Sequence, residues 1–494
     1  MRAVVPALAA AALALTPRAD AAPTFAAAVN YTAGAKANAV ALGDVNGDGR
    51  LDMAVANTNG ATVTVRLGTG SGAFGAASTL SVAPRPDAVA LADLGGDGKL
   101  DLVTANRNGR NISVLRGDGA GGFTAATNFS VANDRPVALV VTDVNGDGKP
   151  DVVTANNVGD DVSVLLGNGA GSFGAATTFD AGTSPTWIAA GDLNGDGKKD
   201  LAVANGGSNN VSVLLGTGTG AFGAATSFAA GTSPTGVALG DLNGDGKLDM
   251  VVTNSGSSNL TVRLGNGAGG FGAATTSATG TGPSAVALAD IDADGRTDVV
   301  TSNATANTVS VLLGNGNGTL QAPLSFAVAN NPASVAVGEL TGDVAPDLVT
   351  ANANGGNASV LLATTQILTV TAAPSVSFGS LSEGATSPAV AVPVTVKSNV
   401  ATGYQLSVSR TAFSSGDIPL AISAPTPPAG QVLDLAAGVA TAMPPGASVN
   451  VGHRTGSPTP PAGDLWQTSL TLGPLPFVRA GLHASTVTFT VVAL

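Results

Sequence analysis

The sequence predicts an all-β protein whose larger part consists of seven similar repeats. An acidic nonapeptide, DVNGDGRLD, occupies residues 44–52. Close copies begin at Asp93, Asp143, Asp192, Asp241 and Asp290, and a worn copy, ELTGDVAPD, begins at Glu339. The spacing is 49 residues except for one interval of 50, and each unit holds four short strand-like runs without a helical period. A fixed period of this length, with four strands per unit, predicts a seven-bladed β-propeller.

The fourth repeat shows the strand order expected of each blade. Its turns predict consecutive antiparallel hairpins between runs at residues 187–191, 201–204, 211–215 and 222–228. The seventh repeat ends after ASVLLATT and lacks the fourth run. Phe25 and Tyr31 stand as far before the first nonapeptide as Phe173 and Phe179 stand before the fourth. The N-terminal strand is therefore predicted to complete the last blade and to close a ring over residues 22–364.

Composition narrows the function classes. The 494-residue chain has no cysteine, and its formal charge of −12 argues against nucleic acid or an anionic membrane as a partner. Arg2, the apolar run 3–15 and the small residues Ala19 and Ala21 predict a signal peptide at residues 1–21, with a retained N-terminal anchor as the alternative. No later apolar run is long enough to span a membrane. We expect a secreted, extracellular or cell-surface-associated monomer.

The nonapeptide has the pattern of a calcium loop. Positions 1, 3, 5 and 9 carry oxygen side chains, and the carbonyl of position 7 can join them. Oxygen ligands without nitrogen or sulfur favour Ca²⁺ over zinc. Position 12 is never Glu and strands flank the loop, so an EF-hand is not expected. The alternative is an acidic hairpin turn without a metal.

Units such as DLNGDGKLDMVVTN followed by VRLGNGAGGFGAATT resemble the FG-GAP/VCBS repeats of integrin α-chain propellers and of many exported bacterial proteins. The resemblance covers roughly residues 23–364 and implies a seven-bladed propeller with Ca²⁺ between the first two strands of a blade. It implies five good sites, a weaker second site with Gly95 at position 3, and a doubtful seventh with Glu339, Thr341 and Val344.

The implied metal ligands, with the carbonyl serving at the basic seventh position, are Asp44, Asn46, Asp48, Arg50, Asp52, Asp93, Asp97, Lys99, Asp101, Asp143, Asn145, Asp147, Lys149, Asp151, Asp192, Asn194, Asp196, Lys198, Asp200, Asp241, Asn243, Asp245, Lys247, Asp249, Asp290, Asp292, Asp294, Arg296 and Asp298.

Antiparallel strand order places the nonapeptides and the glycine turns on one face of the ring, so the opposite face is the candidate ligand face. Trp187 stands there, where the other repeats have Ala, Gly or Ser, and its indole either plugs the channel or offers a binding platform. An asparagine 13 residues after each loop start either binds ligand or ends its strand in a turn. These are Asn57, Asn106, Asn156, Asn205, Asn254, Asn303 and Asn352.

The rest of the chain offers little for catalysis. Glu383 is the only glutamate outside the loops, and His453, His483 and Asp464 lack a G-x-S-x-G elbow, so no enzyme is predicted. The tripeptide Arg116-Gly117-Asp118 spells an integrin-recognition sequence, which we interpret as coincidence. We predict a calcium-binding protein in adhesion or ligand binding, with a glycan or a cell-surface protein as partner. The alternatives are an extracellular polysaccharide-degrading lyase or hydrolase and a purely structural surface protein.

Residues 365–494 abandon the repeat. Runs such as ILTVTA, AVAVPVTVKS and STVTFTVVAL alternate as strands of a small β-sandwich do. The region loosely resembles a bacterial immunoglobulin-like module, which would serve as a spacer or as a second binding module.

Overall fold

The computed structural model describes residues 22–131, 135–343 and 345–364 in full. Beyond these ranges it describes only the backbone of strand β1 (Val5–Pro6) and of strands β30–β39. The predicted signal peptide therefore lies outside the fully described residues. The chain divides into two compact units, one of them formed by residues 23–341 and 346–364. No helix within the described part of the chain has the length and hydropathy that crossing a membrane requires.

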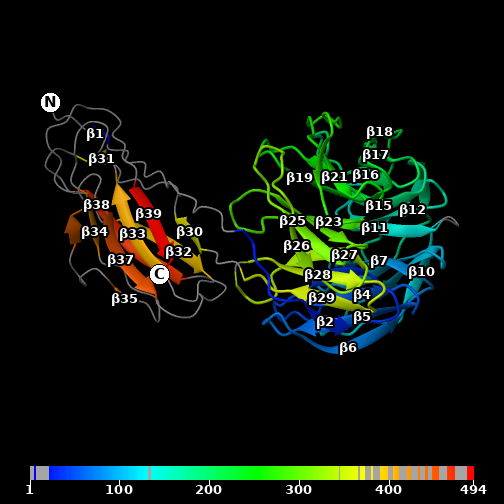
Figure 1. Ribbon diagram of the computed structural model, residues 1–494, viewed down its shortest axis with the longest axis horizontal. Coiled ribbons are helices and arrows are strands. Elements are labelled where there is room, and N and C mark those ends of the chain that lie inside the picture. The colour runs from blue at the N-terminus through cyan, green and yellow to red at the C-terminus, as the bar shows by residue number, and fades with distance from the viewer. Residues whose placement is uncertain are drawn as a thin grey trace. The chain divides into compact units, whose positions relative to one another are not determined.

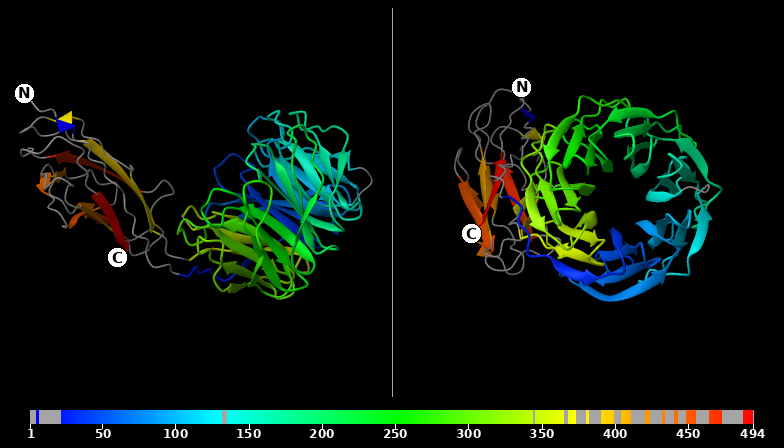
Figure 2. Two further views of the ribbon diagram at one scale, coloured as in Figure 1. Left: turned by 90° about the horizontal axis from the view of Figure 1, so that it is seen from above. Right: turned by 45° about the vertical axis from the view of Figure 1, so that its right-hand side comes forward.

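The larger unit is a seven-bladed β-propeller, as the sequence predicts (Figures 1 and 2). Blade 1 contains β3 (Ala37–Gly43), β4 (Asp52–Asn57), β5 (Thr62–Gly68) and β6 (Phe74–Ser81), and blade 2 contains β7 (Pro86–Ala92), β8 (Asp101–Asn106), β9 (Asn111–Leu115) and β10 (Thr127–Ser130). Blade 3 contains β11 (Pro136–Thr142), β12 (Asp151–Asn156), β13 (Asp161–Leu165) and β14 (Thr177–Asp180), and blade 4 contains β15 (Pro185–Gly191), β16 (Asp200–Asn205), β17 (Asn210–Leu214) and β18 (Thr226–Ala229). Blade 5 contains β19 (Pro234–Gly240), β20 (Asp249–Asn254), β21 (Asn259–Arg263) and β22 (Thr275–Ala278), and blade 6 contains β23 (Pro283–Ala289), β24 (Asp298–Asn303), β25 (Thr308–Leu312) and β26 (Leu324–Ala327). Blade 7 contains β27 (Pro332–Gly338), β28 (Asp347–Asn352), β29 (Asn357–Leu361) and β2 (Val29–Thr32).

Burial changes from strand to strand within a blade. Every residue of each second strand is buried, because both of its faces pack against neighbouring blades. Five of the outermost strands, β2, β10, β14, β18 and β22, have three exposed residues and one partly buried residue, which is an aromatic in all of them except β22. The first strands of consecutive blades contact one another around the whole ring. The core is therefore a set of apolar layers between adjacent blades.

The N-terminal strand closes the ring, which confirms the prediction from spacing. Strand β2 pairs antiparallel with β29, with Val29 opposite Val360 and Thr32 opposite Asn357. The right panel of Figure 2 shows the resulting closed ring, with the blue N-terminal strands beside the yellow strands of blade 7. Every blade thus has four strands, and none is left with an open outer edge on its third strand.

Aromatic pairs join the outer strand of one blade to the next blade. Phe179 meets Phe222 edge to face with ring centroids 5.5 Å apart, and Tyr31 meets Phe74 at the same separation across the closing blade. Comparable pairs are Phe129 with Phe173, Phe228 with Phe271, and Phe25 with Phe326. The aromatic residues that marked the repeats in the sequence are therefore contacts between blades.

The fourth run of each repeat is shorter than predicted in most blades. In blade 4, Phe222 forms an isolated bridge to Gly216, and the strand itself begins only at Thr226. The intervening segment leaves the ladder after Gly223, whose N–H donates to the Leu215 carbonyl at 2.8 Å. Glycine and alanine offer little side-chain packing to hold a strand there.

The described strands of the second unit form three sheets. The five-stranded sheet has the order β30 (Leu368–Ala372), β32 (Val390–Ser398), β38 (Asp464–Leu472), β34 (Leu420–Ser423) and β36 (Ala440–Ala442). The four-stranded sheet has the order β35 (Val432–Leu433), β37 (Ser448–Arg454), β33 (Tyr404–Arg410) and β39 (Val487–Ala493), and β1 pairs with β31 (Ser380–Leu381). Their side chains lie outside the fully described residues, so the immunoglobulin-like interpretation stays a prediction.

Candidate metal loops and channel mouth

The nonapeptides form the loops between the first and second strands of the blades. In blade 1, Asp44 Oδ1 accepts the backbone N–H of Gly47 at 2.7 Å, and Asp44 Oδ2 accepts that of Gly49 at 2.7 Å. Asn46 Oδ1 accepts from Asp48 N, and Asp48 Oδ1 accepts from Arg50 N, each at 3.0 Å. Positive φ at the fourth and sixth positions, both glycine, lets the chain turn tightly enough for these contacts. Oxygens from alternate positions thus gather within one turn.

The loops lie on the same face as the glycine turns, as predicted. The Gly121 N–H of blade 2 donates to the Val45 carbonyl of the blade 1 loop at 3.2 Å. Equivalent bonds recur between later blades, and Gly72 N donates to Leu340 O at 2.9 Å where blade 1 meets blade 7. Six of the seven loops, all except the sixth, are therefore held by a hydrogen bond from the turn of the following blade among the described residues.

Two aspartates of a loop have opposite electrostatic environments. Burial raises the pKa of Asp44, but the N–H groups of Gly49, Gly47 and two further residues outweigh it and lower the pKa below its usual value. Burial raises the pKa of Asp52, against its two backbone hydrogen bonds, and the charges of Asp48 and Asp44 raise it further. A cation in the loop would offset this repulsion.

The ninth-position aspartate is also a structural clamp, which sequence reasoning missed. Asp52 is fully buried, and its Oδ2 accepts from Val45 N at 2.9 Å while its Oδ1 accepts from Gly68 N at 2.7 Å, at the end of the third strand. The same pair of bonds recurs at Asp101, Asp151, Asp200, Asp249, Asp298 and Asp347. A side chain at Gly68 would collide with the Leu51 carbonyl, so blade 1 needs glycine there, whereas in blade 7 the N–H of Ala363 donates the equivalent bond to Asp347. The sequence signal for this role was Asp347, because the degenerate seventh copy keeps the ninth-position aspartate although it changes other positions of the loop.

The sixth loop has the most acidic donor set. Asp290, Asp292 and Asp294 each place a carboxylate oxygen within 4.8 Å of the others. Ligands on opposite sides of one Ca²⁺ are about 4.8 Å apart, twice a typical Ca–O distance of about 2.4 Å, so this donor set fits the ion. Burial, together with the charges of Asp292 and Asp294, raises the pKa of Asp298 to about 7.

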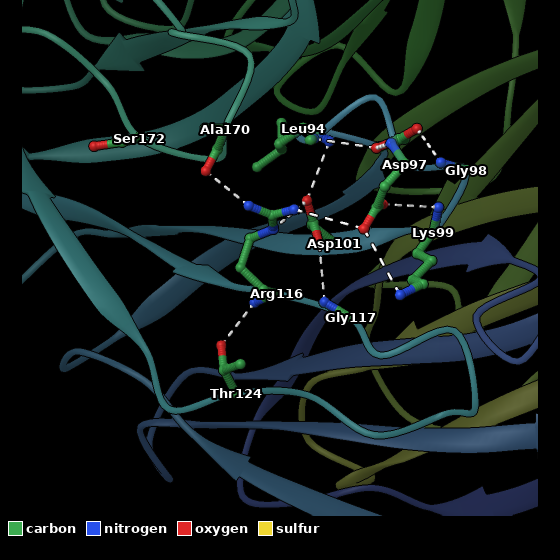
Figure 3. A network of polar contacts seen from close by, with 12 residues as sticks. Leu94, Asp97, Gly98, Lys99, Asp101, Arg116, Gly117, Thr124, Ala170 and Ser172 are labelled. Carbon is green, nitrogen blue, oxygen red and sulfur yellow. Dashed lines mark hydrogen bonds and ion pairs between the residues drawn. The ribbon is translucent and has the colours of Figure 1, made fainter.

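The second loop already contains a cation from the chain (Figure 3). Arg116 Nε lies 2.9 Å from Asp101 Oδ2, and Arg116 Nη2 lies 4.0 Å from Asp97 Oδ2. A side chain at Gly95 would collide with this guanidinium, so Gly95 and Arg116 fit each other. Arg116 also donates to the Ala170 carbonyl of blade 3 at 2.7 Å. The other six repeats have leucine at this position.

Both charged residues of the tripeptide Arg116-Gly117-Asp118 make contacts within the propeller. The Arg116 side chain is engaged by Asp101, and Asp118 Oδ1 accepts the backbone N–H groups of Ala120 and Gly122 at 2.7 and 2.9 Å. Arg116 therefore contacts the second loop and blade 3, and Asp118 is bonded within its own turn. Coincidence stays the interpretation of the tripeptide.

The seventh loop departs from the others. Glu339 Oε1 accepts from the backbone N–H and the hydroxyl of Thr341, at 2.7 and 3.0 Å. Asp343 Oδ1 accepts from Ala345 N at 2.7 Å, while Val344 lies outside the described residues. Position 3 thus offers only a hydroxyl, and that hydroxyl is bonded inside the loop.

On the opposite face, the seven asparagines are buried rather than presented. Asn106 Nδ2 donates to Asn111 Oδ1 at 2.9 Å and to Ser113 Oγ at 2.8 Å. All seven make a bond to the hydroxyl seven residues later, on the third strand. The ligand-binding interpretation of Asn57, Asn106, Asn156, Asn205, Asn254, Asn303 and Asn352 is therefore corrected: the hairpin geometry turns each amide into its own blade.

Trp187 narrows the channel. It lies on β15, pairs with Ala204 of β16, and packs against the apolar clusters of blades 3 to 5 and against that of blades 6 and 7. The indole therefore reaches across the axis, and its remaining surface lines a cavity of about 380 Å³ at the channel mouth. The Trp187 side chain is therefore placed both to narrow the channel and to contact a ligand in this cavity, the two roles that the sequence left open.

Sequence reasoning missed the charged residues of this cavity, which we call the mouth cavity. Its lining includes Lys36, Arg85, Asp87, Arg107, Asn157 and Trp187, and all seven blades contribute to it. The sequence signal for this cavity was Asp87, which is the only charged residue among those that stand six positions before a loop start. The matching residues of the other repeats are Asn38, Val137, Thr186, Thr235, Ser284 and Ala333.

Comparisons with known proteins agree with this architecture. A family model described as FG-GAP-like repeat matches residues 44–104, 93–154, 143–203, 192–252, 241–301 and 294–350. The solved structure of BBS1N in complex with ARL6DN is 14% identical, with a TM-score of 0.50 over 68% of this chain and 96% of that chain. An Agrocybe aegerita lectin specific for non-reducing terminal N-acetylglucosamine is 21% identical (TM-score 0.44; 65% and 87% covered), and virginiamycin B lyase from Staphylococcus aureus is 12% identical (TM-score 0.49; 69% and 99% covered). At these identities the likeness concerns the fold alone. Curated proteins gave no match.

Proposed function

The chain belongs to the FG-GAP-like repeat family, and from this premise we propose that it is an exported, calcium-binding propeller protein that acts in adhesion or ligand binding, with a glycan or a cell-surface protein as its partner. The observation that carries the calcium part is the recurrence, in loops one, three, four, five and six, of an all-oxygen donor set within one tight turn. Hard oxygen donors on a flexible loop suit Ca²⁺ better than Mg²⁺, which demands near-octahedral geometry.

Five ions are proposed for the seven loops. The second loop has the Arg116 guanidinium beside the carboxylates that would otherwise hold an ion. The seventh has at position 3 the Thr341 hydroxyl, which donates to Glu339, in place of the amide or carboxylate of the five loops. Loss of Arg2, Arg18 and Asp20 with the signal peptide changes the net charge from −12 to −13, because two positive charges and one negative charge leave. Five Ca²⁺ would then reduce the charge to about −3 and relieve repulsion among clustered carboxylates.

Calcium is expected to stabilise the folded ring. Each site contributes about 1.4 kcal/mol when free calcium is ten times its Kd, so five sites approach the typical total stability of about 5 to 15 kcal/mol. Differential scanning fluorimetry should show a large fall in Tm with chelator, restored by millimolar Ca²⁺ but not by Mg²⁺. Asp48→Asn should weaken calcium binding, whereas Asp180→Asn, an exposed aspartate outside the loops, should not. A Tm that ignores chelator would refute the calcium assignment.

The partner is tested separately. The purified chain, with calcium and with chelator, is applied to a glycan array and to cell-surface protein extracts. Calcium-dependent capture supports the proposal. Hydrolysis or elimination products from an arrayed polysaccharide would instead support the enzyme alternative.

A further inference from the structure

The mouth cavity is chemically one-sided, although the ring around it is built from similar repeats. Blades 1 and 2 supply Lys36, Arg85, Asp87 and Arg107, so three cations and one carboxylate give this sector a charge of +2. At the position of Lys36 and Arg85, eight residues before the loop start, blades 4 to 7 have Ser184, Ser233, Gly282 and Asn331. A positive site therefore stands in a chain whose net charge is −12.

Arg85 and Arg107 are held in place by Asp87, but their hydrogen-bond donors are not all paired. Asp87, only 9% exposed, lies 3.5 Å from Arg85 Nε and 3.7 Å from Arg107 Nη1, and its Oδ1 accepts from Thr58 Oγ1 at 3.3 Å. Arg107 Nη2 donates to Asn157 Oδ1 at 2.8 Å. The buried Nε atoms of both arginines have no hydrogen-bond partner among the described residues. One carboxylate thus orients two guanidinium groups and neutralises only one of them.

The charges around Arg107 agree with an excess of positive charge in this part of the mouth cavity. Burial lowers the pKa of Arg107, and the neighbouring positive charges of Arg85 and Arg135 lower it further, against the opposing effect of Asp87. An anion would relieve this repulsion, because buried cations are stabilised by an opposite charge within hydrogen-bonding reach.

We propose that the mouth cavity binds a carboxylated sugar residue, a uronate, whose carboxylate meets Arg85 and Arg107 and whose ring lies against Trp187. This inference rests on the proposed ligand-binding function and names the class of ligand and its site. Planar guanidinium groups match a planar carboxylate and form paired hydrogen bonds with it. The cavity, at about 380 Å³, is near the lower limit of typical small-molecule sites of about 300–1,000 Å³ and accommodates one or two sugar rings rather than a large ligand.

The remaining lining favours a sugar over a phosphate. The indole of Trp187 offers an apolar surface to the C–H face of a pyranose. The Thr186 hydroxyl donates to the Ala204 and Pro234 carbonyls, at 3.1 and 2.9 Å, and its oxygen can still accept a hydrogen bond from a sugar hydroxyl. Asp87 accepts hydrogen bonds from hydroxyl groups but repels a doubly charged anion. A single negative charge with several hydroxyls therefore fits better than a phosphate dianion.

Isothermal titration calorimetry on the calcium-saturated full chain tests the proposal with D-galacturonate, trigalacturonate, methyl-esterified galacturonate, D-galactose and inorganic phosphate. Galacturonate should bind at least about tenfold more tightly than its neutral ester or galactose. Arg107→Gln and, separately, Arg85→Gln should each weaken galacturonate binding about tenfold or more. Arg110→Gln is the matched control, because Arg110 is an exposed arginine of the same blade outside the cavity lining, and it should change the affinity less than about twofold. Tighter binding of trigalacturonate than of the monosaccharide would identify a polymer chain as the source of the uronate, and equal binding would identify the free sugar.

Several results would overturn the inference. These are equal binding of the neutral ester, phosphate binding as tight as that of galacturonate, no change with either arginine variant, or no heat with any uronate up to about 10 mM. If the Tm still depends on calcium and an arrayed ligand is still captured while uronates fail, this inference alone is refuted. If capture and calcium dependence are both lost, the proposed function fails with it.

Discussion

Tyr31 is the residue on which closure of the ring can be tested most directly. It lies on β2, the only strand of blade 7 that is remote in sequence from its neighbours. Its ring meets Phe74 of blade 1 edge to face at 5.5 Å, its hydroxyl accepts the Phe74 N–H at 3.3 Å, and the Arg66 guanidinium lies 5.8 Å from the ring centroid. Tyr31→Ala removes all three contacts without touching the strand's backbone ladder.

The expected loss of unfolding free energy is the sum of the contributions from side-chain burial, the aromatic pair and the cation–π contact. Half-burial of the side chain contributes about 1 to 1.5 kcal/mol. The edge-to-face pair adds about 0.5 to 1.5 kcal/mol, and the cation–π contact about 0.5 to 1 kcal/mol. The unfolding free energy should therefore fall by about 2 to 4 kcal/mol, which corresponds to about 3 to 6 °C in Tm for a domain of this size.

Urea denaturation followed by circular dichroism in saturating calcium measures this change. Val29→Ala on the same strand is the control, since Val29 is 51% exposed and its replacement should cost no more than about 0.5 kcal/mol. Tyr31→Phe should lie close to wild type, because it keeps the ring. Equal stability of Tyr31→Ala and Val29→Ala would refute the view that β2 fastens the ring through Tyr31.

Three further predictions concern the loops. Asp347→Asn should lower the unfolding free energy by about 2 to 4 kcal/mol without changing bound calcium, because the amide cannot accept at both positions where Asp347 now accepts backbone N–H groups; an unchanged urea midpoint would contradict the clamp. Gly95→Asn combined with Arg116→Leu should raise the calcium count by one ion per chain in equilibrium dialysis with elemental analysis, since it restores the pattern of the other loops; an unchanged count would show that another feature disables loop two. Asp298, with its pKa raised to about 7, binds its proton more tightly in the folded than in the unfolded state, so in chelator this contribution is complete below pH 3.8 and is lost as the pH rises through about 7. The unfolding free energy in chelator, and with it the Tm, should therefore fall between pH 5 and pH 8, by at most about 1.4 kcal/mol per pH unit. Asp298→Asn should flatten this pH dependence, and added calcium should reverse it. A Tm independent of pH in both the wild type and the variant would contradict the assignment.

Repetition made most of the fold predictable from residue spacing. A period of about 49 residues, four strand-like runs per unit and a missing run at the end of the seventh unit sufficed for the blade number and for the origin of the closing strand. The physical reason is that each blade is a local meander, whose turns and alternation are encoded within the repeat itself. The position of the loops on one face followed from strand order alone.

What the tertiary structure decided depends on contacts between repeats or between distant turns. Whether a strand-ending amide faces solvent depends on the hairpin around it, so the sequence left open whether the asparagine 13 residues after each loop start binds ligand or ends its strand, and the structure shows it buried. The match of Gly95 with Arg116 joins two turns of one blade. Arg85, Asp87 and Arg107 all come from blade 2, but the packing of neighbouring blades brings Thr58 of blade 1 to Asp87 and Asn157 of blade 3 to Arg107. Periodicity reports what the repeats share, whereas the mouth cavity is formed where they differ, and only closure of the ring brings those differences together.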